Sequence, residues 1–144
     1  MVNVMMEIKI PPVRVEASFN QKTGYVDVRA RNVEYQITEL PEHGGRGDKL
    51  TPLEAFIAGL TSCEAIMARM VASQMGLKEL GEIRVDANAE FGIGEGLKRL
   101  KIRYVLKGVD KEKAETIVDL VKRMCPIYNT LSRTLEIEDE IVVS

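Results

Sequence analysis

The two cysteines of this 144-residue chain are the side chains best suited to chemistry. Cys63 ends the apolar run 52–63, and Cys125 is followed directly by Pro126 at the junction of two helical patterns. The chain has one histidine, His43, so it offers almost no His as an alternative catalyst. Two cysteines in such settings point to thiol redox chemistry.

Each cysteine also has a simpler interpretation. Cys63 has Leu60 and Met67 at helical spacing, so it could be a small buried core residue. Cys125 could be a chance thiol at a helix end. A zinc site would need two more good ligands, and no Cys-x-x-Cys motif is present, so we expect no metal.

Composition excludes several classes of protein. The 45% of apolar and 29% of charged residues are those of an ordinary globular chain, and the length fits a single domain over residues 1–144. A net charge of −2, without a basic block and with few aromatic residues, argues against nucleic-acid binding. The N-terminal ten residues do not resemble a secretory signal, and the apolar runs are interrupted well short of a membrane span. We therefore expect a cytoplasmic protein with no membrane partner.

The first half of the chain predicts antiparallel strands followed by one long helix. Hydrophobic alternation indicates strands over 13–19, 25–30 and 33–38, with a hairpin connection at 20–24. A polar, glycine-rich loop follows at 41–49. The pattern Thr51-Pro52-Leu53-Glu54 then predicts a capping box and a helix that runs to about residue 75, where Gly76 ends it.

The second half predicts a strand pair, two helices and a last strand. Alternating residues indicate strands over 83–91 and 100–106. Asp110 caps an expected helix over 111–124, a short helix follows over 127–134, and 135–143 closes the chain as a strand. The order of elements favours an α+β fold with antiparallel pairs over an alternating Rossmann pattern.

These residues resemble the OsmC/Ohr family over essentially the whole chain. The resemblance rests on the run 51–63 with its terminal Cys63, on Cys125-Pro126, and on the order of the elements. It implies an intertwined homodimer whose antiparallel sheets wrap around long central helices. It also implies reduction of organic hydroperoxides, with Cys63 attacking the peroxide and Cys125 resolving the product as a disulfide. No cofactor is implied, and an external dithiol, a lipoyl group in some family members, would restore the thiols.

Two positions depart from the family pattern. The family's hydroperoxidases have a Glu directly after the Pro of the helix start, where this chain has Leu53, and the acid here is Glu54. The position that matches the family's catalytic Arg is Lys22, which offers a point charge in place of a planar guanidinium. We take Glu54 and Lys22 as the candidate catalytic partners of the two cysteines, with Arg46 as another source of positive charge.

The departures keep two other functions open. One is an OsmC-like dimeric scaffold that binds a small apolar ligand or a partner without peroxidase turnover. The other is a dithiol oxidoreductase that acts on other disulfides. The distance between the two cysteines decides whether they can form a disulfide, because a disulfide needs Cα atoms within about 7 Å of each other.

Overall fold

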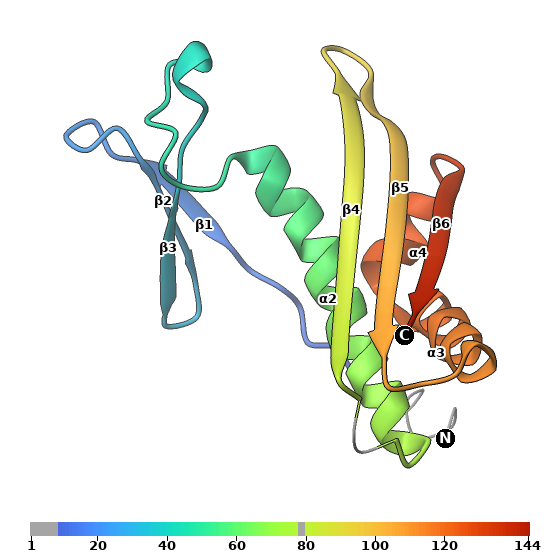
Figure 1. The fold of residues 1–144 in the computed structure, drawn as a ribbon. Coiled ribbons are helices and arrows are strands. Elements are labelled where there is room, and N and C mark those ends of the chain that lie inside the picture. The colour runs from blue at the N-terminus through green and yellow to red at the C-terminus, as the bar shows by residue number, and fades with distance from the viewer. Residues whose placement is uncertain (1–8, 78–79) are drawn as a thin grey trace. The chain divides into compact units, whose positions relative to one another are not determined.

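The computed structural model describes residues 9–77 and 80–144. The chain divides into two compact units, Met1–Phe56 and Ile57–Ser144 (Figure 1). The helices and strands confirm the expected α+β class, and each unit is described by itself.

The first unit contains a three-stranded antiparallel sheet in the order β1-β2-β3. The strands are β1 (Glu16–Phe19), β2 (Val26–Ala30) and β3 (Val33–Ile37), close to the three predicted ranges. Gly24 ends the first connection in the left-handed region, at a φ of 79°, which glycine adopts without a steric penalty. The local turn signals therefore placed both hairpins.

One face of this sheet is apolar throughout. The paired residues Phe19 and Val26, Val28 and Tyr35, and Ala30 and Val33 lie directly opposite one another and so share a face. Val28 and Ile37 are buried, whereas Phe19, Val33 and Tyr35 are exposed, Phe19 at 58%. The unit on its own therefore leaves large apolar side chains of the sheet exposed to water.

The loop after β3 is held by backbone hydrogen bonds. A 3₁₀ turn, η1 (Pro41–His43), is followed by Gly44 in the left-handed region. The N–H of Gly47 donates to the Glu39 carbonyl, and the N–H of Arg46 donates to the Thr38 hydroxyl. Gly45 lies so close to the Glu39 backbone that a Cβ there would overlap it. The segment is thus tied to the end of β3.

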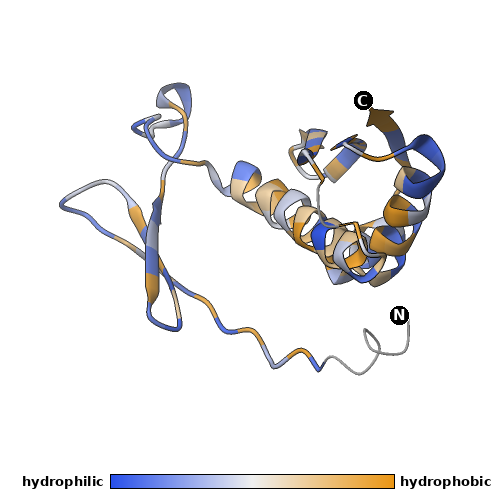
Figure 2. Ribbon diagram, turned by 60° about the horizontal axis from the view of Figure 1, so that its bottom comes forward, coloured by the Kyte–Doolittle hydropathy of each residue, from blue (hydrophilic) through white to orange (hydrophobic). Residues whose placement is uncertain are grey.

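The long helix α2 (Pro52–Gln74) begins in the first unit and continues in the second. Gly76 lies in the left-handed region, and the N–H of Leu77 donates to the Ala72 carbonyl, which ends the helix as the sequence predicted. Figure 2 shows that α2 is largely hydrophobic along its length. By length and composition alone α2 could cross a membrane, a criterion that the core helix of a soluble protein also meets.

The second unit contains a three-stranded sheet in the order β4-β5-β6. β4 (Glu82–Gly92) and β5 (Gly96–Lys107) form the predicted antiparallel hairpin. β6 (Ile137–Val143), however, runs parallel to β5. The expectation of antiparallel sheets is therefore wrong for this pair. The reason is that two helices connect β5 to β6, and such a crossover returns the chain in the same direction.

The helices of that crossover are α3 (Lys111–Met124) and α4 (Pro126–Ser132). The Asp110 side chain accepts a hydrogen bond from the Lys113 N–H, as expected of the α3 N-cap. Figure 1 shows α2 and α3 on the same side of the sheet. The core of the second unit is formed by one stripe of α2, one stripe of α3 and the inward residues of β5. The buried side chains that form this core are Leu60, Glu64, Ala68, Val71, Ala72, Leu100, Ile102, Tyr104, Leu106, Ala114, Ile117, Val118 and Val121.

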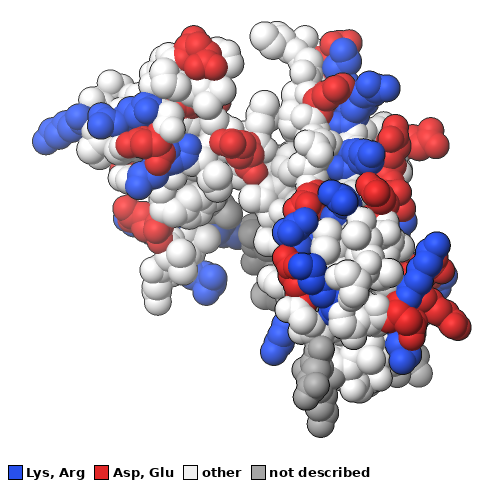
Figure 3. All heavy atoms as spheres, in the orientation of Figure 1, with Lys and Arg blue, Asp and Glu red and all other residues white. Residues whose placement is uncertain are grey.

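The other face of this sheet is charged. Basic residues of β5 lie beside acidic residues of both neighbouring strands, as in the pairs Lys107–Glu82 (3.0 Å) and Arg103–Glu140 (3.8 Å). Figure 3 shows the positive and negative side chains interspersed over the surface. The alternation along β5 therefore separates a solvated ionic face from an apolar one.

Candidate functional site

The second unit brings the two cysteines together. Cys63 and Cys125, 62 residues apart, have their Sγ atoms 3.0 Å from each other, and the Cys125 thiol donates toward the Cys63 sulfur. Both are free thiols. Cys63 is partly exposed, whereas Cys125 is fully buried. The arrangement can form a disulfide with little movement, and only one of the two thiols is open to a reagent.

Small side chains on α2 allow this approach. Gly59 lies one turn before Cys63, and a Cβ at Gly59 would be 3.7 Å from Cδ1 of Ile127 on α4. This is an ordinary van der Waals distance, so the start of α4 lies beside this turn of α2 and an alanine at position 59 would also fit. The thiol of Cys63 is thereby presented to the α3–α4 junction.

Cys125 lies at that junction and belongs to both helices. Its N–H donates to the Val121 carbonyl and ends α3, and its Sγ accepts from the Tyr128 N–H at 3.4 Å and caps α4. Pro126 takes the first position of α4, where the missing N–H costs nothing. The prediction of a cysteine at the start of the short helix is confirmed.

The surroundings of Cys63 within the second unit oppose its ionisation. Burial is the largest cause that raises the pKa of the Cys63 thiol, followed by its side-chain hydrogen bond with Cys125 and by the negative charges of Cys125 and Glu64. The backbone N–H of Ile127 acts in the opposite direction. These surroundings therefore disfavour a thiolate at Cys63.

Glu54 makes the capping box that the sequence predicts. Its carboxylate accepts from the Thr51 N–H at 2.8 Å, and its own N–H donates to the Thr51 hydroxyl at 3.2 Å. Glu54 and Cys63 are nine positions apart on α2, which corresponds to about 900° and so to opposite sides of the helix. The carboxylate thus has a structural role at the helix start, and its catalytic role stays a prediction.

Lys22 is exposed at the tip of the β1–β2 connection. Its backbone N–H and that of Thr23 both donate to the Asn20 side-chain oxygen, which fixes the turn. Lys22 and Glu54 belong to the first unit and the two thiols to the second. The catalytic role of Lys22 also stays a prediction.

Arg46 is anchored beside the same turn. Its guanidinium lies 5.0 Å from the centroid of the Tyr25 ring and donates to the Thr23 carbonyl at 3.3 Å. The Tyr25 hydroxyl in turn donates to Asp48 at 2.6 Å, and this hydrogen bond raises the pKa of Tyr25. The first unit therefore holds two positive side chains, Lys22 and Arg46, at one hairpin end.

Sequence reasoning missed a buried ionisable pair next to the thiols. Glu64 follows Cys63 on α2, is fully buried, and accepts a hydrogen bond from the hydroxyl of the equally buried Tyr104 on β5. A signal was present, because Glu64 lies four positions after Leu60 and four before Ala68, in the middle of an apolar helical stripe. A carboxyl at such a position has to be buried.

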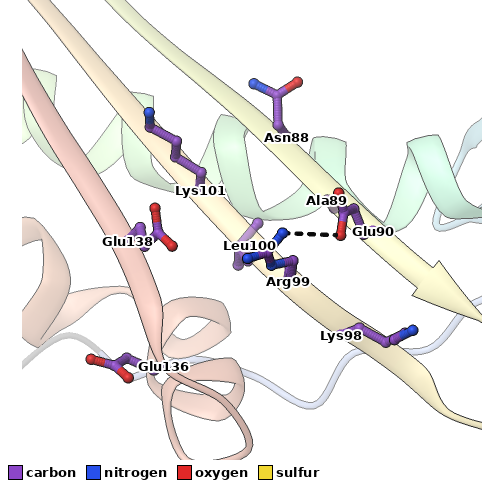
Figure 4. A pocket seen from close by; sticks show the side chains of 9 residues that line it. All are labelled: Asn88, Ala89, Glu90, Lys98, Arg99, Leu100, Lys101, Glu136 and Glu138. Atoms are coloured by element: carbon purple, nitrogen blue, oxygen red, sulfur yellow. Dashed lines mark ion pairs between the residues drawn. The ribbon is translucent and has the colours of Figure 1, made fainter.

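A hollow of about 790 Å³ lies on the charged face of the second sheet (Figure 4). Its walls carry charges of both signs, including the ion pair between Arg99 and Glu90 at 4.0 Å. Neither cysteine lines it. Within residues 9–77 and 80–144, no three His, Cys, Asp or Glu side chains cluster as metal ligands would.

Relatives of the chain bear names that refer to hydroperoxides. An organic hydroperoxide resistance protein of Xanthomonas axonopodis pv. citri is 30% identical over 97 residues, which are 65% of this chain and 68% of the relative. A hydroperoxide reductase of Mycoplasma genitalium is 28% identical over 124 residues, 81% of this chain and 86% of the relative.

The fold is shared with solved structures. An OsmC like protein from Mycoplasma pneumoniae superposes with a TM-score of 0.81 at 17% identity, over 94% of this chain and 99% of that one. Residues 45–140 match the family model described as OsmC-like protein. Together, the match over two thirds of the sequence and the shared fold show that the chain belongs to the family of OsmC-like proteins.

Proposed function

We propose that this protein is a thiol-dependent peroxidase that reduces organic hydroperoxides to alcohols. The observation that carries the proposal is the 3.0 Å separation of the Cys63 and Cys125 sulfurs. The names of two relatives, an organic hydroperoxide resistance protein and a hydroperoxide reductase, support the substrate class.

The different accessibility of the two thiols supports different roles for them. Cys63 is partly exposed and can meet a peroxide, whereas Cys125 has no exposed surface. We therefore take Cys63 as the attacking residue and Cys125 as the resolving residue. The N–H of Ile127 directed at the Cys63 sulfur is the one group of the second unit named above that favours a thiolate there.

The reaction has three balanced steps. The Cys63 thiolate attacks the terminal peroxide oxygen, the O–O bond breaks, and the alkoxide takes a proton and leaves as the alcohol while Cys63 becomes a sulfenic acid. The Cys125 thiol condenses with the sulfenic acid to a disulfide and releases water. An external dithiol, for which a lipoyl-type group is our candidate, then reduces the disulfide and is itself oxidised.

Two residues are candidates for a positive charge that would favour the thiolate. Lys22 is the candidate that the family resemblance brings, and Arg46 lies at the same hairpin end. Glu54 stays in the proposal as a candidate that orients such a cation. The capping box gives Glu54 a sufficient structural reason to be present.

We also propose that the protein forms a homodimer and is located in the cytoplasm. The sheet of the first unit exposes Phe19, Val33 and Tyr35 on its apolar face, an area that a small unit cannot leave in water at no cost. A second copy of the chain is the partner that the family resemblance implies for it.

The test starts from the fully reduced protein mixed with cumene hydroperoxide. Free thiols are counted and the intact mass is followed with time. We expect both thiols to disappear with a loss of two hydrogens in mass. Cys63→Ser should abolish the reaction, and the matched variant Cys125→Ser should stop at a sulfenic acid that dimedone captures. Survival of both thiols in excess peroxide would refute the proposal.

A second candidate is a scaffold that binds a small apolar ligand without turnover. The raised pKa of the Cys63 thiol favours it, because a neutral thiol reacts poorly with peroxides. Thiols that survive peroxide would support this candidate. Exchange of both thiols with a model disulfide in the absence of peroxide would instead identify a dithiol oxidoreductase.

A further inference from the structure

The buried carboxyl of Glu64 has no role in the peroxidase steps described above. It lies in the middle of the stripe of α2 that packs against the sheet, and none of its surface is exposed. Its neighbours along this stripe, Leu60 and Ala68, are apolar and buried. Because isolated buried charges are strongly destabilising, an ionisable residue at this place calls for an explanation.

The hydrogen bonds of the carboxyl are incomplete. The Tyr104 hydroxyl donates to Oε2 of Glu64, while Oε1 is buried without a hydrogen-bond partner in the part of the chain that the structure describes. One neutral donor compensates poorly for a buried carboxylate. Burial accordingly raises the pKa of Glu64 to about 7, against smaller opposing effects of Tyr104 and Lys122.

The groups around Glu64 come from every element packed against it. Tyr104 lies on β5 and Tyr128 on α4, and burial raises the pKa of both hydroxyls. Lys122 on α3 forms an ion pair with Asp139 on β6, so these two charges largely offset each other. The charge of Glu64 also acts on the thiol of Cys63, the residue that precedes it on α2, so the two ionisations are linked.

Glu64 and Cys63 are adjacent on the helix, and a negative Glu64 disfavours a negative Cys63. We propose that Glu64 is a positioning residue for the thiol chemistry: the Cys63 thiolate forms more readily while the buried carboxyl of Glu64 holds its proton, and ionisation of Glu64 opposes it. The inference rests on the proposed function for its relevance to peroxides.

The test is the pH dependence of Cys63 alkylation by iodoacetamide in the reduced, full-length protein. Rates are measured from about pH 5 to about pH 9 for the wild type and for Glu64→Gln, and modified Cys63 is identified by peptide mass. The amide keeps an acceptor for Tyr104 but cannot ionise. We expect the ratio of variant to wild-type rates to be near one at acid pH and to rise about tenfold as Glu64 ionises, the effect of a one-unit change in thiol pKa.

A structural effect of the substitution would change the rates by the same factor at every pH. A ratio that stays constant with pH would therefore overturn the inference. Glu115→Gln is the matched control, since it removes an exposed carboxyl from α3 in the same unit. Its ratio to the wild type should stay constant.

Tyr104→Phe is a second, independent variant. It keeps the carboxyl but removes the hydroxyl that favours its ionised form, so the midpoint of the pH-dependent rate change should move to higher pH. If Glu64→Gln does not fold, an unmoved midpoint in Tyr104→Phe would overturn the inference. Alkylation needs no peroxide, so the pH effect can hold where peroxide turnover fails, and turnover can succeed where the pH effect fails.

Discussion

The two units of the chain differ in how far they bury their apolar side chains. The second unit buries the inward residues of β5 and one stripe each of α2 and α3, and in doing so it also buries Glu64 and Cys125. The first unit has an equally regular apolar sheet face but leaves Phe19, Val33 and Tyr35 exposed. The second unit thus has its own core, and the two cysteines belong to that unit. We expect another surface to cover the exposed sheet face of the first unit.

The largest expected effect tests the core of the second unit. The folded-state pKa of Glu64, about 7, is raised above the ordinary 4.5, so wild-type stability should fall as pH rises from about 4.5 to about 7. The substitution Glu64→Gln removes this pH-dependent loss of stability. The free energy of unfolding of the variant, relative to wild type, should therefore improve by about 3 kcal/mol between pH 4 and pH 8, measured by denaturant titration at each pH. A difference independent of pH would mean that Glu64 is not buried as a carboxyl.

A smaller effect tests the exposed face of the first unit. If a second copy covers this face, Phe19→Ala should raise the dimer dissociation constant about tenfold or more, because interface aromatic residues contribute above about 1 kcal/mol each. Analytical ultracentrifugation measures it. Ser18→Ala, on the opposite face of β1, is the matched control and should leave the constant unchanged. Equal effects of the two variants, or a monomeric wild type, would contradict the homodimer.

The smallest effect concerns the start of α2. Glu54→Gln should change the free energy of unfolding by less than about 0.5 kcal/mol, because Gln also completes the capping box. If Glu54 only caps the helix, the alkylation rate of Cys63 should be unchanged too, since the two residues lie on opposite sides of the helix. A large loss of thiol reactivity would instead add Glu54 to the active site.

Local signals in the sequence were enough for most elements. The hairpin with Gly24, the capping box of Thr51 and Glu54, and the N-cap Asp110 each depend on residues close together in the chain, and each is confirmed. The predicted direction of β6 was wrong, because this direction depends on how a crossover of two helices packs. No local sequence pattern indicates that packing.

The candidate site shows the same difference between what local sequence signals predict and what long-range packing determines. The sequence identified Cys63 and Cys125 by their neighbours, but their 3.0 Å separation results from the packing of α2 against the α3–α4 junction. Glu64 lies among apolar residues at helical spacing, and this pattern indicates a core stripe without indicating how a carboxyl is accommodated in it. Its bond to Tyr104 spans 40 residues of sequence and could not be predicted locally.

The double role of Cys125 at the end of one helix and the start of the next has a kinetic consequence for the proposed reaction. Two helices hold its sulfur beside Cys63, so condensation with a sulfenic acid is intramolecular, with an effective molarity far above any peroxide concentration in a cell. The competing fate is a second peroxide attack that yields a sulfinic acid, which ordinary thiols do not reduce. In the proposed reaction, the position of Cys125 would therefore favour the reversible disulfide over the sulfinic acid when peroxide is abundant.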